Sequence, residues 1–121
     1  MTKAAQKRIL VVDDDEDIGV FLEIALTVSG YMPIVCVSSK AKEIEGRFDL
    51  ALIDLLLDGE ANALSLIAGL CERGVPVLVM TGLSVDAPLV GAAKEAGALQ
   101  VIHKPFDLPQ LRLVLNEVLP A

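Results

Sequence analysis

Aromatic residues make up only 3% of this 121-residue chain, and tryptophan is absent. A hydrophobic core therefore has to be built from aliphatic side chains, which the 54% hydrophobic content can supply. That composition suits a parallel sheet buried on both faces. The length is enough for one domain core and too short for two.

Positive charge is also scarce, since 10 Lys and Arg residues face 17 Asp and Glu residues, for a net charge of −7. This balance argues against sequence-independent binding to nucleic acid or to an anionic membrane. No apolar run approaches the roughly 20 residues of a membrane span, and the polar, basic start does not resemble a signal peptide. The two cysteines, Cys36 and Cys71, form no CxxC motif and are expected to be reduced core thiols. We therefore expect a cytoplasmic protein.

Short apolar runs alternate with helical patterns five times along the chain. The runs predict strands over Ile9–Val12, Pro33–Val37, Leu50–Ile53, Val77–Met80 and Leu99–Ile102. The helical patterns predict helices over Ile18–Leu26, from Ser38 to Gly46, over Ala63–Cys71, over Pro88–Ala96 and over Leu111–Val118. Because crossovers between parallel strands are right-handed, this (βα)₅ order predicts an α/β doubly wound sheet. Residues 8–121 are expected to form the domain and residues 1–7 a flexible segment.

Polar residues follow the predicted strands, where open parallel sheets bind their ligands. Asp13, Asp14 and Asp15 follow the first strand, and Asp54 follows the third. Carboxylates this crowded destabilise a fold unless a cation lies among them. Mg²⁺ prefers such oxygen ligands, so the acidic cluster predicts a metal site.

Hydrogen-bond donors and a cation are expected at the same edge. Thr81 and Gly82 follow the fourth strand, and Lys104 follows the fifth. A hydroxyl, a backbone N–H and an ammonium could share the charge of a phosphoryl group that also contacts the metal. Asp54 could then be the carboxylate nucleophile that forms an aspartyl phosphate.

In this arrangement the chain resembles the receiver domain of bacterial two-component response regulators, the CheY-like superfamily. The resemblance rests on residues 9–18, 49–55, 76–82, 96–98 and 104–106, which occur in the family's order and spacing. It implies a flavodoxin-like sandwich with strand order 2-1-3-4-5, in a single-domain regulator or in part of a larger one. It also implies phosphorelay signalling, with a histidine kinase or histidine phosphotransfer protein as donor, an unknown downstream protein, and a monomer or weak homodimer.

The resemblance assigns a role to each site residue. Asp54 accepts the phosphoryl group, and Thr81, Gly82 and Lys104 bind it. The Lys104–Pro105 peptide bond is cis. Mg²⁺, or Mn²⁺ in its place, is held by Asp13, Asp14, Asp54 and the backbone carbonyl of Leu56. Such a domain is a phospho-acceptor and not an enzyme acting on a metabolite.

The chain departs from the family pattern at several positions. Val101 stands where Tyr or Phe is frequent, so activation cannot be relayed there by a moving ring. The segment from Ser38 to Phe48 is short, which predicts a short second helix. Asp58 and Asn62 replace a frequent Pro and Gly in the loop after Asp54, and Asn62 is expected to keep a turn there with positive φ.

The first predicted helix carries a second apolar row, formed by Val20, Ile24 and Val28 at a spacing of four residues. Two interpretations remain open from the sequence. The row either widens the buried face of the helix, or it forms an exposed surface that binds a partner.

Two other functions are open at this point. A degenerate receiver would keep the fold and bind a partner without phosphorylation. Asp13-x-Asp15 after an apolar strand is also similar to the start of haloacid-dehalogenase-type phosphatases, although the second acidic pair of that family is missing late in this chain.

Overall fold

The computed structural model describes residues 6–44, 46–57 and 60–119. Five parallel strands form one sheet in the order β2-β1-β3-β4-β5. They are β1 (Arg8–Val12), β2 (Met32–Cys36), β3 (Leu50–Asp54), β4 (Val77–Thr81) and β5 (Gln100–His103). The α-helices are α1 (Glu16–Val28), α2 (Glu60–Glu72), α3 (Pro88–Glu95) and α4 (Leu108–Val118), and η1 (Ser38–Glu43) is a 3₁₀ helix. The predicted doubly wound fold and its strand order are confirmed.

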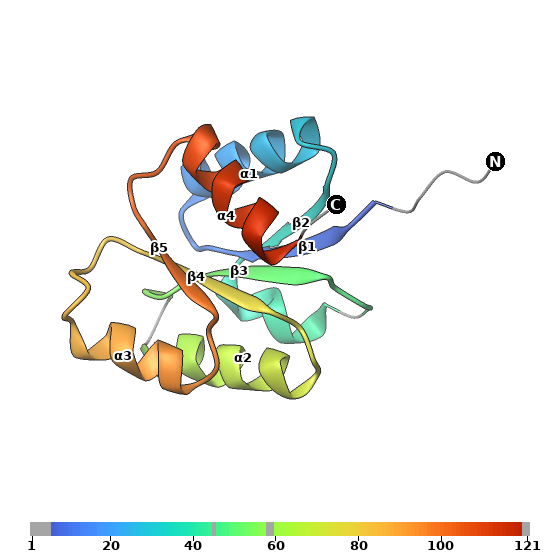
Figure 1. Ribbon diagram of the computed structural model, residues 1–121. Helices are drawn as coiled ribbons and strands as arrows, with labels where there is room; N and C mark the ends of the chain where they lie inside the picture. Colours follow the sequence, from blue (N-terminus) through green and yellow to red (C-terminus); the bar gives the residue numbers. More distant parts are fainter. Residues whose placement is uncertain (1–5, 45, 58–59, 120–121) are drawn as a thin grey trace.

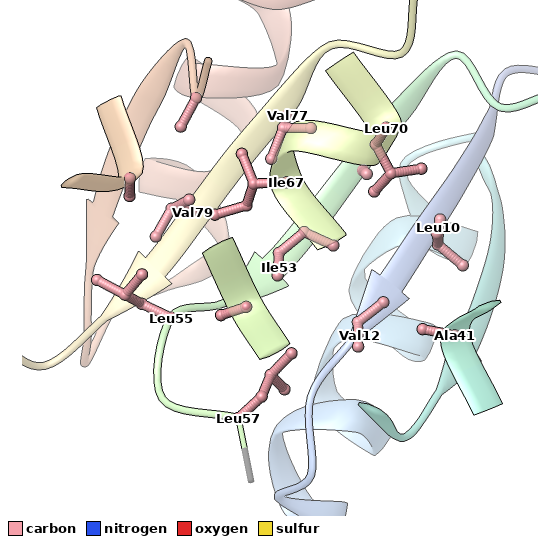
Figure 2. Packing of buried hydrophobic residues seen from close by; sticks show 14 of the residues in the cluster. Leu10, Val12, Ala41, Ile53, Leu55, Leu57, Ile67, Leu70, Val77 and Val79 are labelled. Atoms are coloured by element: carbon pink, nitrogen blue, oxygen red, sulfur yellow. The ribbon is translucent and has the colours of Figure 1, made fainter. Parts of the chain in front are cut away.

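The helices cover both faces of the sheet in two layers (Figure 1). Alternate residues of each strand point to opposite faces. On one face they pack against η1, α2 and α3, around residues such as Leu10, Ile53 and Ile67 (Figure 2). On the other face they pack against α1 and α4, around Leu22 and Leu111 among others. Burial on both faces explains why β1, β3 and β4 are continuous apolar runs in the sequence.

Several element boundaries differ from the predicted ones by a few residues. Pro33 does lie on an edge strand, as its missing N–H favours, but β2 runs from Met32 to Cys36. The short second helix is a 3₁₀ helix, and α2 begins three residues before Ala63. Asn62 therefore lies in the first turn of α2, and no described residue other than glycine has positive φ, so the predicted turn was wrong. Asp58 lies outside the described residues.

The ends of the helices follow simple capping chemistry. Asp15 is the N-cap of α1, where its Oδ1 accepts from the amides of Asp17 and Ile18 at 2.9 and 3.4 Å. Glu16 and Asp17 follow in the first turn of α1, where negative charge is favourable. At α4, Asp107 and Gln110 form a capping box that the sequence analysis missed.

The predicted flexible segment 1–7 lies mostly outside the described residues. Within the described part, the carbonyl of Lys7 accepts from the amide of Met32 at 2.8 Å. None of the described helices is both long and apolar enough to cross a membrane.

Gly97 lies in the loop between α3 and β5, and it tests how tightly this loop packs against α2. Its φ is +121°, and a Cβ at this position would lie 2.6 Å from Sγ of Cys71. Gly97→Ala is therefore expected to lower the free energy of unfolding by about 1–3 kcal/mol. Gly69→Ala is the matched control, because Gly69 lies inside α2 with no described heavy atom within 4 Å of its added Cβ beyond its own helix.

Urea unfolding of both variants measures these effects. Gly69→Ala should raise the stability by about 0.5–1 kcal/mol through its helix preference. Equal stabilities for Gly97→Ala and wild type would contradict the close packing of Gly97 on Cys71.

Candidate functional site

The carboxyl ends of β1, β3 and β4 bring three buried polar residues to one edge of the sheet. Asp54 and Thr81 are the last residues of the adjacent strands β3 and β4, and Asp13 directly follows β1. Asp13 is 3% exposed and Asp54 is 8% exposed. The strand order reverses between β1 and β3, which makes this edge the topological switch point where such sheets bind ligands.

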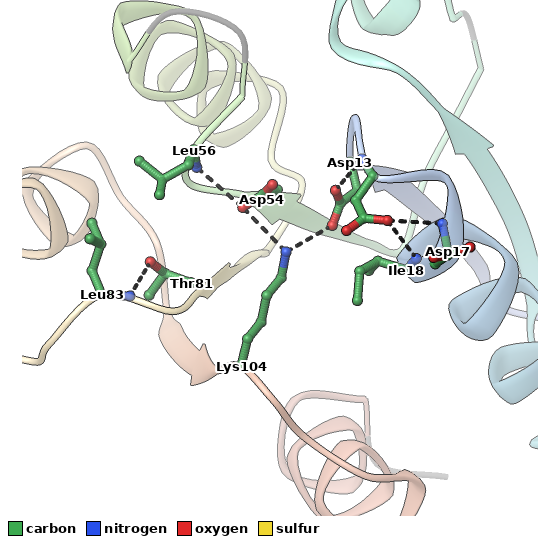
Figure 3. Close-up of polar contacts among 9 residues, drawn as sticks. Asp13, Asp17, Ile18, Asp54, Leu56, Thr81, Leu83 and Lys104 are labelled. Atoms are coloured by element: carbon green, nitrogen blue, oxygen red, sulfur yellow. Dashed lines mark hydrogen bonds and ion pairs between the residues drawn. The ribbon is translucent and has the colours of Figure 1, made fainter.

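Lys104 supplies the positive charge of this edge. Its Nζ lies 3.1 Å from Oδ2 of Asp13 and 3.5 Å from Oδ1 of Asp54 (Figure 3). The amide of Lys104 donates to the carbonyl of Thr81 at 2.8 Å, which fixes the backbone at this position. The Lys104–Pro105 bond is cis, as predicted. Beyond Pro105, the ring of Phe106 packs edge-on against that of Phe21 in α1.

Local backbone bonds orient the other two side chains. The amide of Leu56 donates to Oδ1 of Asp54 at 3.2 Å, and the amide of Leu83 donates to Oγ1 of Thr81 at 3.0 Å (Figure 3). Because a hydroxyl can accept and donate at once, Thr81 can still donate its proton to an anion. Among the described residues, a Cβ added at Gly82 would meet no heavy atom within 4 Å beyond its chain neighbours, so there is space beside this backbone.

The site has more negative charge than its own lysine can balance. Burial raises the pKa of the Asp13 carboxyl above its ordinary value of 3.8, and the charge of Asp54 raises it further. The amide of Asp15, which donates to Oδ1 of Asp13 at 2.8 Å, and the ammonium of Lys104 offset only part of this rise. Two buried carboxylates that share one monovalent cation have the charge and the hard oxygen donors that suit Mg²⁺ or Mn²⁺.

Asp14 is held by the loop after β2. Its Oδ1 accepts from the amide of Ser38 at 2.8 Å, and its Oδ2 accepts from the hydroxyl of Ser38 at 2.9 Å. In residues 6–44, 46–57 and 60–119, no three acidic, histidine or cysteine side chains come close enough together to hold a metal ion. The structure therefore brings Asp13, Asp54 and Lys104 together, and a role for Asp14 or for the Leu56 carbonyl as a metal ligand stays a prediction.

The contact of Ser38 with Asp14 was not predicted from the sequence. The N-cap position of η1 is Val37, which makes no capping bond, and the hydroxyl of Ser38 donates to Asp14. The strand order could have indicated the contact between Ser38 and Asp14. Since β2 lies beside β1, the residues just after these two strands are neighbours.

The second apolar row of α1 is exposed. Val20, Ile24 and Val28 are 56%, 60% and 63% exposed, so they do not widen the buried face of the helix. Val20 also lines a groove of about 510 Å³ between α1 and β2, together with Val35, Cys36 and Val37 and an acidic rim that includes Glu16 and Glu23. At the opposite edge of the sheet, Val101 is half-buried and packs against the core.

The raised pKa of Asp13 gives a prediction for stability. The folded chain binds this proton more tightly than the unfolded chain, so stability falls as pH rises from 3.8 through the raised pKa. In EDTA at pH 7, Asp13→Asn should therefore melt at a higher temperature than wild type, with Lys104 still close to Asp54. The gain should shrink as pH falls toward 3.8.

Thermal unfolding between pH 3.5 and 8 measures this effect, with Asp86→Asn at an exposed loop position as the control for removing any acidic charge. A destabilised Asp13→Asn protein at pH 7, or a gain that does not change with pH, would contradict the charge excess.

Comparisons with known proteins agree with this geometry. The profile of the response regulator receiver domain matches residues 9–116. The DNA-binding response regulator MtrA of Mycolicibacterium smegmatis is 35% identical over 96% of this chain and 54% of its own length. Sporulation initiation phosphotransferase F of Bacillus subtilis is 27% identical over 94% of both chains. The chain thus spans about half the length of relatives such as MtrA and most of the length of the phosphotransferase.

A solved structure shares the fold. The crystal structure of a response regulator from Thermotoga maritima superposes with a TM-score of 0.84 at 24% identity, covering 97% of this chain and all of the other. The profile match covers most of the chain and reaches from β1 into α4. The chain therefore belongs to the response regulator receiver domain family, which acts in two-component signal transduction.

Proposed function

We propose that Asp54 is the phospho-acceptor of this receiver domain and that histidine-phosphorylated proteins are its donors. The observation that carries the proposal is the ammonium of Lys104 between the carboxylates of Asp13 and Asp54, with the buried hydroxyl of Thr81 at the end of the next strand. The buried carboxylate of Asp54 thus lies near groups of both charges at the ligand-binding edge. This is the arrangement that phosphoryl transfer requires, since the protein mainly positions the group and neutralises its charge.

The chemical step is a displacement at phosphorus. Because Oδ1 of Asp54 accepts from Leu56 and faces Lys104, we assign the attack to Oδ2. The new bond joins Oδ2 to phosphorus as the bond from phosphorus to the imidazole nitrogen breaks. The electron pair of that bond stays on the histidine of the donor. Thr81, the amide of Gly82 and Lys104 then bind the oxygens of the transferred group.

Mg²⁺, or Mn²⁺, belongs to this proposal as the group that lowers the negative charge of the site. Asp13, Asp14, Asp54 and the carbonyl of Leu56 would hold it. The shared Lys104 supports this assignment, because it places a cation against two of the three carboxylates. The domain is then a phospho-acceptor that loses its phosphoryl group slowly by hydrolysis, in the cytoplasm, and acts on no metabolite.

Two alternatives lack support in the site. A haloacid-dehalogenase-type phosphatase would use Asp15 as its second acid, but Asp15 is bound to the amides that begin α1. A degenerate receiver would be expected to lack a site residue, whereas Asp13, Asp54, Thr81 and Lys104 all lie at one edge of the sheet.

Intact mass after incubation with acetyl phosphate tests the function. We expect wild type to gain one phosphoryl group in Mg²⁺, and to gain none in EDTA or after Asp54→Asn. Asp86→Asn, at an exposed loop position, should be labelled like wild type. Unlabelled wild type in saturating Mg²⁺ would overturn the proposal and favour a partner-binding degenerate receiver.

We place the donor on the exposed apolar row of α1, formed by Val20, Ile24 and Val28. Contiguous exposed apolar side chains mark interaction surfaces, and α1 begins directly after the acidic residues of the site. Val101 offers no ring that could relay the change to the β5 edge.

Ile24→Lys tests this surface. The variant should fold normally and be labelled by acetyl phosphate like wild type, while transfer from a phosphorylated histidine phosphotransfer protein that labels wild type slows at least about tenfold. Leu113→Lys is the matched control, since Leu113 is equally exposed on α4. Unchanged transfer to Ile24→Lys would remove the row from the docking surface.

A further inference from the structure

Ser38, in the loop after β2, donates two hydrogen bonds to the carboxylate of Asp14. The Ser38 amide donates to Oδ1 at 2.8 Å and the Ser38 hydroxyl donates to Oδ2 at 2.9 Å. Hydrogen bonds to a carboxylate are short and strong, and two of them on different oxygens fix both the position and the plane of the group. The bonds span 24 residues of sequence, so they join two separate loops.

Backbone pairing between β1 and β2 fixes the positions of Asp14 and Ser38 relative to each other. The amide of Asp13 donates to the carbonyl of Cys36 at 3.2 Å, which extends the pairing of β1 with β2 up to the site. Val37 is extended, with φ −89° and ψ 163°, and η1 begins at Ser38. The position of Ser38 is therefore set by the sheet and by η1 together.

We propose that Ser38 is a positioning residue for the metal site, which holds Asp14 in the orientation that binds Mg²⁺. The proposal rests on the function proposed above, in which Asp14 is a ligand of the ion. A carboxylate has about four lone-pair directions, and Ser38 uses two of them, so its bonds do not by themselves block a cation. Outer partners that hydrogen-bond to metal ligands typically change metal affinity by about 10–100-fold when they are removed.

A purely structural role is the competing explanation. The amide of Ser38 is the first N–H of η1, and the first amides of a helix need acceptors from outside it. Asp14 could therefore serve only to cap η1. The two roles differ in what they predict, because a cap affects stability alone whereas a positioning residue also affects the affinity for Mg²⁺.

A graded series at Ser38 separates the two donors. Ser38→Thr keeps both the hydroxyl and the amide, and Ser38→Ala removes the hydroxyl. Ser38→Pro removes both donors, and proline is tolerated here because Ser38 is the first residue of η1 and Val37 is already extended. Ser65→Ala is the control, since Ser65 is exposed on α2.

The Mg²⁺ dissociation constant of each protein is measured by titration of backbone amide chemical shifts, and its melting temperature is measured in EDTA. We expect a wild-type constant for Ser38→Thr and Ser65→Ala, a constant raised about tenfold for Ser38→Ala, and a larger rise for Ser38→Pro. An unchanged or lower constant for Ser38→Ala and Ser38→Pro, with or without a lower melting temperature, would overturn the positioning role and leave the phospho-acceptor function intact. Wild type that binds no Mg²⁺ would overturn both proposals.

Discussion

The ammonium of Lys104 lies between two buried carboxylates, and the rest of the structure can be understood from this contact. Asp13 and Asp54 lie at the ends of two adjacent strands, β1 and β3, and their buried carboxylates would repel each other. One lysine reduces that repulsion without cancelling it, as the raised pKa of Asp13 indicates. The remaining negative charge is what a divalent cation would neutralise in the site that we propose for phosphoryl transfer.

This contact depends on the packing of the whole sheet. Asp13, Asp54 and Lys104 meet because β1, β3, β4 and β5 are parallel and in register. Aliphatic layers on both faces fix that register, since a shift by one residue would exchange the buried faces of a strand. Ser38 connects the edge strand to this site in a similar way, because its bond to Asp14 joins the end of β2 to the loop that follows β1.

Much of this arrangement could be predicted from the sequence. Apolar runs such as Leu50–Ile53 can be recognised because strands buried on both faces do not alternate, and residues that follow such runs must gather at one edge. What could not be predicted depends on contacts between distant segments. The bonds of Ser38 to Asp14, the 3₁₀ form of η1 and the exposure of Ile24 all follow from how the elements pack, which local patterns do not contain.

Diffraction from crystals grown with Mn²⁺ tests most directly whether this edge of the sheet is one cation and phosphoryl site. Anomalous scattering locates Mn²⁺ independently of any assumption about its ligands. We predict one strong peak in contact with Asp13, Asp14, Asp54 and the carbonyl of Leu56. A peak at another position, or none at saturating Mn²⁺ with Lys104 still between Asp13 and Asp54, would contradict the account.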